Sequence, residues 1–279
     1  MRHLFLLILL LTNSSVFAQF SDDFSDGDFT ANPIWSGDAG FFTINTGKLQ
    51  SNTGAPLGSS TDYYLSTPST LATEATWEFY FDFQFGTSGS NYADIYLMSD
   101  VADLNSVNNG YFVRLGGTPD EISLFKMVAG TPAVLIDGVD GLINSSSSNP
   151  FNIRISRDAT NNWTLEYDDL GASPTGGFVS AGTVNDNSVS TSSFFGLIIT
   201  QSTAASPVDG HFFDNFNVAA IVPDTDAPTL TSATAISNTE VDVLFNEALD
   251  PTTSQVATNY SADNSLGNPT TAIIDGGNP

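Results

Sequence analysis

Polar and apolar residues alternate with a period of two along much of this chain, and the longest such run covers residues 76–85. The side chains on one face of this run are all large and apolar: Trp77, Phe79, Phe81, Phe83 and Phe85. This alternation is typical of a β-strand with one buried face. Because five large apolar side chains need a second sheet to cover them, the run predicts a β-sandwich.

Shorter runs of the same kind occur before and after it, with turn-forming residues such as Asn108-Asn109-Gly110 and Asp137-Gly138 between them. The strands expected after residue 40 cover 41–49, 94–98, 111–115, 121–127, 133–136, 151–156, 163–167, 194–200 and 211–218. Helical periodicity is almost absent. About ten short strands over some 200 residues predict an all-β fold, a two-sheet jelly-roll sandwich.

The first 18 residues have the pattern of a secretory signal peptide. Arg2 gives a positive start, residues 4–11 form an apolar run, and Val16-Phe17-Ala18 presents small residues before Gln19. The apolar run is shorter than the roughly 20 residues that cross a bilayer. The alternative is an ordinary buried N-terminal strand. We expect export to the exterior or the cell surface, with no transmembrane segment.

A linker at 220–228, which contains Pro223 and Pro228, separates the predicted jelly roll at 19–219 from a second pattern at 229–279. New alternating runs occur there at 229–235 and 240–245. A complete Ig-like sandwich takes roughly 100 residues, about twice the length that remains. We therefore expect an incomplete Ig-like domain, as in a fragment or a truncated product.

The composition excludes several classes of function. The chain has 31 acidic and 6 basic residues, a formal charge of −25, and no cysteine. Nucleic acid and anionic lipid would be repelled, and no disulfide braces the fold. His211 is the single histidine outside the predicted signal, so a histidine-based triad or zinc site is not expected. We expect His211 on the outer face of its strand, beside Phe213.

Asp22 and Asp214 stand among apolar residues in the first and last expected strands. Alternation places Asp214 on one face with Phe216, and Asp22 on one face with Phe24. A buried carboxylate is costly unless it is paired, hydrogen-bonded or metal-bound. Since the first and last strands of a jelly roll commonly lie side by side, we predict that these carboxylates hold a structural Ca²⁺. The alternative is that one aspartate caps a turn and the other faces solvent at a bulge.

Tyr92, Asp94 and Tyr96 share one strand face by period two. Exposed rings beside a carboxylate suit the binding of a polysaccharide or a cell-surface glycan, so these three residues are the predicted ligand-binding surface. The alternative interpretation is that the tyrosines belong to the core, as aromatic residues on strands often do.

Two resemblances to known families add to these expectations. Phe20-Ser21-Asp22-Asp23-Phe24-Ser25-Asp26-Gly27, Trp35, the segment 157–166 and Phe212–Val218 resemble the concanavalin-like, laminin-G-like jelly rolls of exported lamin-tail proteins from Gram-negative bacteria. That resemblance implies a Gram-negative source, a role in glycan binding or adhesion, and a structural calcium; some branches hydrolyse polysaccharides. Asp226-Ala227-Pro228, the segment 241–250 and Asn259-Tyr260 resemble surface-layer (SbsA-type) Ig-like domains, which implies a spacer.

Retaining glycosidases need a nucleophile and a general acid about 5–5.5 Å apart. In the hydrolases of this fold, both groups come from a Glu-x-Asp-x-Glu motif on one strand. The nearest match, Glu166-Tyr167-Asp168, lacks the second glutamate. We therefore predict a non-catalytic extracellular binding or adhesion module with no catalytic residues. A passive spacer or scaffold is the alternative, and a polysaccharide hydrolase is the third possibility.

Overall fold

The computed structural model describes residues 18–169, 177–221, 227–247, 249–263 and 267–274. The chain divides into two compact units, Met1–Val222 and Pro223–Pro279, and the division falls inside the predicted linker. The signal-peptide assignment concerns residues that lie outside this description, apart from Ala18, and stays a prediction. No helix in the described ranges is long and apolar enough to cross a membrane.

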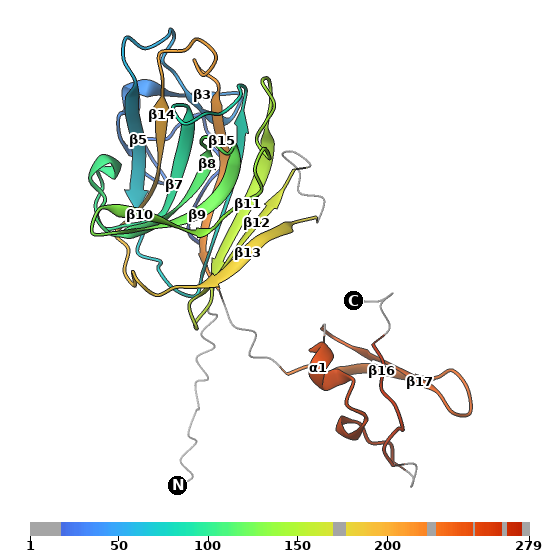
Figure 1. The fold of residues 1–279 in the computed structure, drawn as a ribbon. Helices are drawn as coiled ribbons and strands as arrows, with labels where there is room; N and C mark the ends of the chain where they lie inside the picture. Colours follow the sequence, from blue (N-terminus) through green and yellow to red (C-terminus); the bar gives the residue numbers. More distant parts are fainter. Residues whose placement is uncertain (1–17, 170–176, 222–226, 248, 264–266, 275–279) are drawn as a thin grey trace, which may run out of the picture. The chain divides into compact units, whose positions relative to one another are not determined.

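The first unit is a sandwich of two antiparallel sheets, as the alternation predicts (Figure 1). Sheet A pairs, in order, β13 (Val179–Asn185), β12 (Asn162–Asp168), β11 (Pro150–Arg157), β6 (Ala75–Phe83), β15 (His211–Ala220), β4 (Lys48–Ser51) and β3 (Phe42–Asn45), with β1 (Ala18–Asp22) also on β15. Sheet B pairs β10 (Thr131–Ile136), β9 (Glu121–Val128), β8 (Gly110–Gly116), β7 (Tyr92–Ser99), β14 (Phe194–Gln201), β5 (Thr61–Pro68) and β2 (Ser36–Gly37). Two short 3-10 turns, η1 (Ala39–Phe41) and η2 (Leu104–Ser106), connect strands. The all-β jelly-roll prediction is confirmed.

The predicted strands are formed, with one notable difference in bounds, and the sequence pattern missed β5 and β13. The expected strand at 41–49 is a hairpin of β3 and β4, in which Asn45 pairs with Lys48. Thr46 and Gly47 form its turn with positive φ angles of 51° and 73°. The Gly47 turn signal therefore ends one strand and starts another, because a glycine adopts this conformation at little cost.

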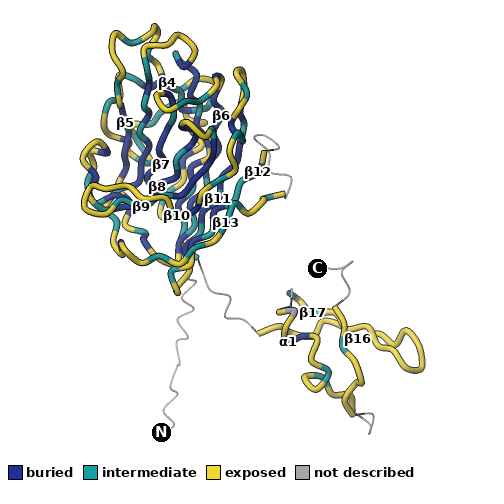
Figure 2. The backbone as a smooth tube through the Cα atoms, in the orientation of Figure 1, coloured by how far each residue is buried: buried dark blue, intermediate teal, exposed yellow. Residues whose placement is uncertain are grey.

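The core lies between the two sheets, where the central strands β6, β7, β8 and β14 are buried along most of their length (Figure 2). Trp77, Phe79, Phe81 and Phe83 on β6 are at most 2% exposed and share one cluster with Ile95 and Leu97 of sheet B. Trp77 also stacks on Trp163, with ring centres 5.6 Å apart. The aromatic face of β6 is thus covered by the second sheet, as predicted.

A β-bulge on β15 shifts the alternation of the last strand. Asp214 pairs with Tyr80 of β6, and Asn217 pairs with Glu78. Asn215 and Phe216 on β15 therefore lie opposite one residue of β6, Phe79. Asn215 has a φ of 53°, in the left-handed region that asparagine tolerates better than most residues. Because of this extra residue, the alternation of inward and outward side chains after the bulge is the reverse of the alternation before it.

The bulge corrects two expectations for this strand. Phe213 is buried before the bulge and Phe216 after it, so Asp214 does not share the inner face with Phe216. His211 does lie on the same face as Phe213, but that face is the inner one. His211 is fully buried rather than exposed, with its ring centre 5.1 Å from Phe83 and 4.6 Å from Phe85.

The second unit contains an antiparallel pair, β16 (Leu230–Ala235) and β17 (Val241–Phe245), followed by α1 (Pro251–Ser254) and the 3-10 turn η3 (Ala257–Asn259). Both strands agree with the sequence. None of its described hydrophobic residues is buried; Val241 is 58% exposed and Val243 42%. A two-stranded hairpin of this kind is marginally stable alone. The Ig-like assignment stays a prediction.

Candidate functional site

Asp22 ends β1 and points toward the inner side of the sandwich edge. Its register partner on β15 is Phe216, so the predicted contact between the first and last strands is confirmed. One carboxylate oxygen accepts the Phe24 amide hydrogen at 2.9 Å, and the other accepts the Trp35 indole Nε1–H at 2.8 Å. Burial raises the pKa of Asp22, and these two hydrogen bonds oppose that rise.

Asp214 lies on the outer face of sheet A. Its Oδ2 is 3.2 Å from the Lys48 Nζ, and its Oδ1 accepts the Asn215 amide hydrogen at 2.8 Å. Lys48 also lies over the Tyr80 ring, 5.4 Å from its centre. Burial raises the pKa of Asp214, while the Asn215 amide and Lys48 lower it.

The two predicted metal ligands therefore do not converge. The bulge turns Asp214 outward, whereas Asp22 points to the buried indole of Trp35. Each carboxylate already has donors of its own, and Lys48 occupies the place that a cation would take beside Asp214. This pair does not fit a calcium ion. Within the described ranges, no three Asp, Glu, His or Cys side chains are grouped so as to hold a metal ion.

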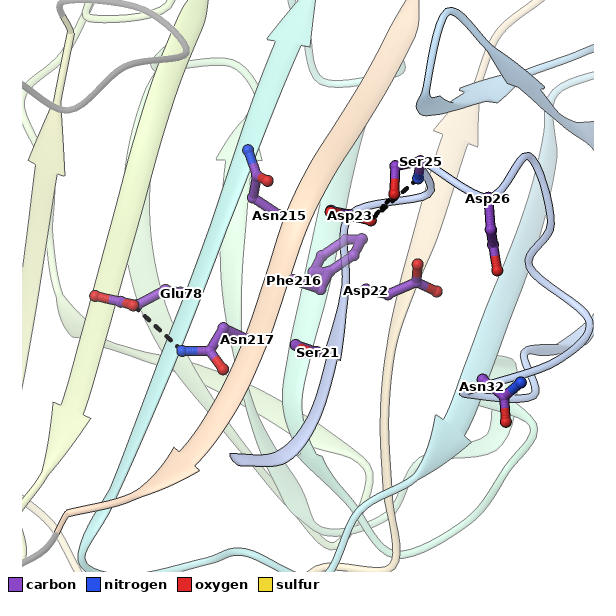
Figure 3. A pocket seen from close by; sticks show the side chains of 10 residues that line it. All are labelled: Ser21, Asp22, Asp23, Ser25, Asp26, Asn32, Glu78, Asn215, Phe216 and Asn217. Atoms are coloured by element: carbon purple, nitrogen blue, oxygen red, sulfur yellow. Dashed lines mark hydrogen bonds between the residues drawn. The ribbon is translucent and has the colours of Figure 1, made fainter. Parts of the chain in front are cut away.

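A hollow of about 460 Å³ opens beside Asp22 (Figure 3). Its walls come from β1 and the loop after it, from β6, and from the bulge of β15. The residues that line it are Ser21, Asp22, Asp23, Ser25, Asp26, Asn32, Glu78, Asn215, Phe216 and Asn217. We call this feature the polar hollow. Eight of these residues lie in the segments 20–27 and 212–218, which carry the jelly-roll resemblance, but only the fold brings the two segments together with Asn32 and Glu78.

Short-range hydrogen bonds fix several of the carboxylates in the polar hollow. Asp23 accepts the amide and hydroxyl hydrogens of Ser25 at 3.1 and 2.7 Å, and Asp26 accepts the amide of Asp28 at 3.0 Å. Glu78 accepts from the Asn217 side-chain amide at 3.4 Å (Figure 3). Turns closed by Asp side chains in this way are rigid. The carboxylates are thus held in place without losing all their acceptor positions.

Two asparagines add uncommitted amides to the hollow. Asn32 and Asn215 have φ angles of 55° and 53°, and both residues are exposed. Neither side chain has a hydrogen-bond partner in the described part of the chain. An amide side chain offers two donor hydrogens and one acceptor oxygen. The hollow therefore offers donors and acceptors together, which is the chemistry that hydroxyl groups need.

The side chains that line the hollow carry negative charge only. Four carboxylates line it, those of Asp22, Asp23, Asp26 and Glu78, and its lining contains no lysine or arginine. Arg154 lies behind Glu78, with Nε 2.6 Å from the carboxylate, and offsets that one charge. The negative charge of the other carboxylates, together with the chain's formal charge of −25, disfavours the binding of anionic ligands.

Tyr92, Asp94 and Tyr96 share the outer face of sheet B, opposite Gly116, Arg114 and Phe112. Asp94 is only 7% exposed and accepts two hydrogen bonds from Arg114, each 2.8 Å long. Tyr96 is 4% exposed and packs on Phe112 with ring centres 5.0 Å apart. Burial raises the pKa of Asp94 and that of Tyr96. Only Tyr92 keeps a partly exposed ring, so the predicted open surface of three residues is not formed.

The segment nearest to a hydrolase motif lies on β12. Asp168 is 1% exposed, and Glu166 pairs across the sheet with Arg154. A carboxylate buried to this extent is not accessible to a polysaccharide chain. The geometry gives no support to Glu166 and Asp168 as a catalytic pair.

No family model and no curated protein sequence matches the chain. Solved structures do. The exoplasmic domain of VIP36 in its Ca²⁺/Man3GlcNAc-bound form has a TM-score of 0.52 at 12% identity, covering 76% of this chain and 92% of its own. The carbohydrate recognition domain of Emp47p has a TM-score of 0.50 at 13% identity, covering 74% and 96%. That of Emp46p in its potassium-bound form has 0.50 at 12%, covering 75% and 100%.

These likenesses show the fold, a jelly-roll sandwich, which is consistent with the predicted concanavalin-like sandwich. The narrower resemblances, to lamin-tail proteins and to SbsA-type Ig-like domains, stay predictions.

Proposed function

We propose that the first unit is a non-catalytic carbohydrate-binding module of an exported protein, and that the polar hollow holds a neutral saccharide. The observation that carries this proposal is the hollow itself, in which amide and carboxylate groups from three chain segments face one space. The likeness to the carbohydrate recognition domain of Emp47p and to the VIP36 domain in its Man3GlcNAc-bound form supports the same class of ligand.

The size and chemistry of the hollow suit a sugar. Small-molecule pockets measure about 300–1,000 Å³, and the hollow at about 460 Å³ lies within that range. Each sugar hydroxyl donates one hydrogen bond and accepts others. Asp26 offers acceptors, while the amides of Asn32 and Asn215 offer both. The Asp26 carboxylate is already held by the Asp28 amide, so it loses little freedom when a ligand binds.

A glycan array with the full chain, followed by calorimetry on the strongest neutral oligosaccharide, tests the proposal. Asp26→Asn and Asn32→Ala alter the hollow, and Asp158→Asn is a matched control, because Asp158 also closes an exposed turn through its carboxylate but lies on another loop. A hydrogen bond to a charged acceptor is worth about 1.5–3 kcal/mol and Asp26→Asn removes the charge, so we expect this variant to weaken binding by up to about 100-fold.

Uronic-acid oligosaccharides should bind more weakly than neutral ones. The proposal fails if no glycan binds, or if the hollow variants bind like Asp158→Asn. The alternative, a passive spacer or scaffold, is favoured by one observation, the second unit with its exposed hairpin residues, and an array without any binding would support it. Adhesion at a Gram-negative surface is the wider role that we propose for a module of this kind.

A further inference from the structure

A second surface with binding chemistry lies around Arg114 on the outer face of sheet B. The guanidinium carbon of Arg114 is 4.5 Å from the ring centre of Tyr92, 5.1 Å from that of Phe125 and 5.6 Å from that of Phe112. We call Tyr92, Arg114 and Phe125 the Arg114 platform. These residues come from three neighbouring strands, β7, β8 and β9, so the sheet itself sets their spacing.

Buried partners hold the platform in one geometry. Asp94 binds Nε and Nη2 of Arg114 side by side, which fixes the plane of the guanidinium. Phe125 stacks on the buried ring of Phe112 at 5.1 Å with an interplanar angle of 8°. Neither the cation nor this ring needs to be ordered when a ligand arrives, so binding would cost little side-chain entropy.

The platform also keeps groups free for a ligand. The Arg114 side chain is 29% exposed, and its Nη1 has no hydrogen-bond partner among the residues that the structure describes. Tyr92 and Phe125 are half-buried, so part of each ring reaches solvent. Two partly exposed rings beside an uncommitted N–H donor match the two sides of a pyranose, its C–H face and its hydroxyls.

We propose that the Arg114 platform is a second saccharide-binding surface, distinct from the polar hollow. One pyranose ring packs against the exposed parts of the Tyr92 and Phe125 rings, and Nη1 of Arg114 donates a hydrogen bond to a hydroxyl. Asp94 is a positioning residue, because its carboxylate orients Arg114 and is too buried to contact the sugar. Since Asp94 neutralises Arg114, the expected ligand is a neutral saccharide rather than an anionic one.

The two sites lie on different sheets of one sandwich. Glu78 and Asn217 of the hollow belong to sheet A, whereas the platform belongs to sheet B, and the aromatic core lies between them. A module with both sites would join two polysaccharide chains. This inference shares its ligand class with the proposed function but does not depend on the hollow.

Calorimetry on the full chain with cellohexaose, laminarihexaose and mannohexaose tests the platform. The variants are Tyr92→Ala and Arg114→Lys; the lysine keeps the positive charge beside Asp94 but removes the guanidinium plane and Nη1. Phe178→Ala is the matched control, because Phe178 also lies against an arginine, 4.0 Å from Arg154 of β11, but just before β13 and away from the platform. Thermal unfolding of each variant checks that the fold is retained.

We expect two oligosaccharides per wild-type chain, and one for Tyr92→Ala or Arg114→Lys, with the platform affinity lowered at least tenfold. Phe178→Ala should retain two, and Asp26→Asn in the hollow should retain the platform site. This inference would be overturned if the platform variants bound like Phe178→Ala and Asp26→Asn abolished the one binding site observed. That result would leave the proposed function standing. A wild-type chain that binds none of the three probes would overturn both.

Discussion

Protonation of His211 should make the first unit lose stability in mild acid. The imidazole is fully buried against Phe83 and Phe85, its Nδ1 is 3.2 Å from the Ser51 hydroxyl, and Nε2 has no partner in the described part of the chain. Burial lowers the pKa of His211 from 6.5 to about 3. The folded chain thus keeps His211 neutral where the unfolded chain protonates it.

The sign and size of the effect follow from proton linkage. Between pH 6.5 and 3 the unfolded state binds more protons at His211, so this contribution to stability is complete above pH 6.5 and is lost as the pH falls. With folded and unfolded pKa values of about 3 and 6.5, the loss between pH 7.5 and 5.0 is about 2 kcal/mol.

The measurement is urea unfolding of the wild type and of His211→Phe at pH 7.5 and 5.0. Phenylalanine keeps a ring beside Phe83 and Phe85 but cannot titrate. Asp22, Asp94 and Asp214 have raised pKa values and change stability in the opposite direction, but they are present in both proteins. Their contributions cancel in the difference between the two proteins.

We therefore expect the wild type to lose about 2 kcal/mol more than His211→Phe on acidification. If both proteins lose the same amount, burial does not keep His211 neutral in the folded chain, and the assigned place of its ring on the inner face beside Phe83 is refuted.

Two further predictions concern the aspartates expected to bind calcium. Asp214→Ala should cost about 1 kcal/mol, because Lys48 loses its partner, and thermal unfolding should show the same loss with and without a chelator; a loss seen only when calcium is present would restore the calcium hypothesis. Asp22→Asn should cost about 1–3 kcal/mol in urea unfolding, since an NH2 donor replaces one of the two oxygens that accept from Phe24 and Trp35. Trp35→Phe removes the indole donor, so adding Asp22→Asn to it should cost clearly less; an equal cost in both backgrounds would contradict the assigned hydrogen bond.

The sequence by itself determined the class of fold and most strand positions in this protein. The aromatic alternation at 76–85 requires a covering sheet, and the turn residues separate the strands that follow. Adjacency of the first and last strands was also predictable, since a jelly roll brings them together, and Asp22 and Phe216 are indeed paired. These features depend on residues that are neighbours in the chain or on the topology of one fold class.

Only the tertiary structure determined which of the candidate site residues are exposed and which come together. A single extra residue at Asn215 reversed the facing of Asp214, and period-two reasoning cannot detect such a bulge, although an asparagine next to an aspartate was a possible signal. The partners that satisfy the candidate carboxylates lie far away in sequence, 20 residues for Arg114 with Asp94 and 166 for Lys48 with Asp214. Which donor meets a carboxylate is set by strand order and register, and that order is what turned a predicted open surface into the Arg114 platform and gathered the polar hollow from three separate segments.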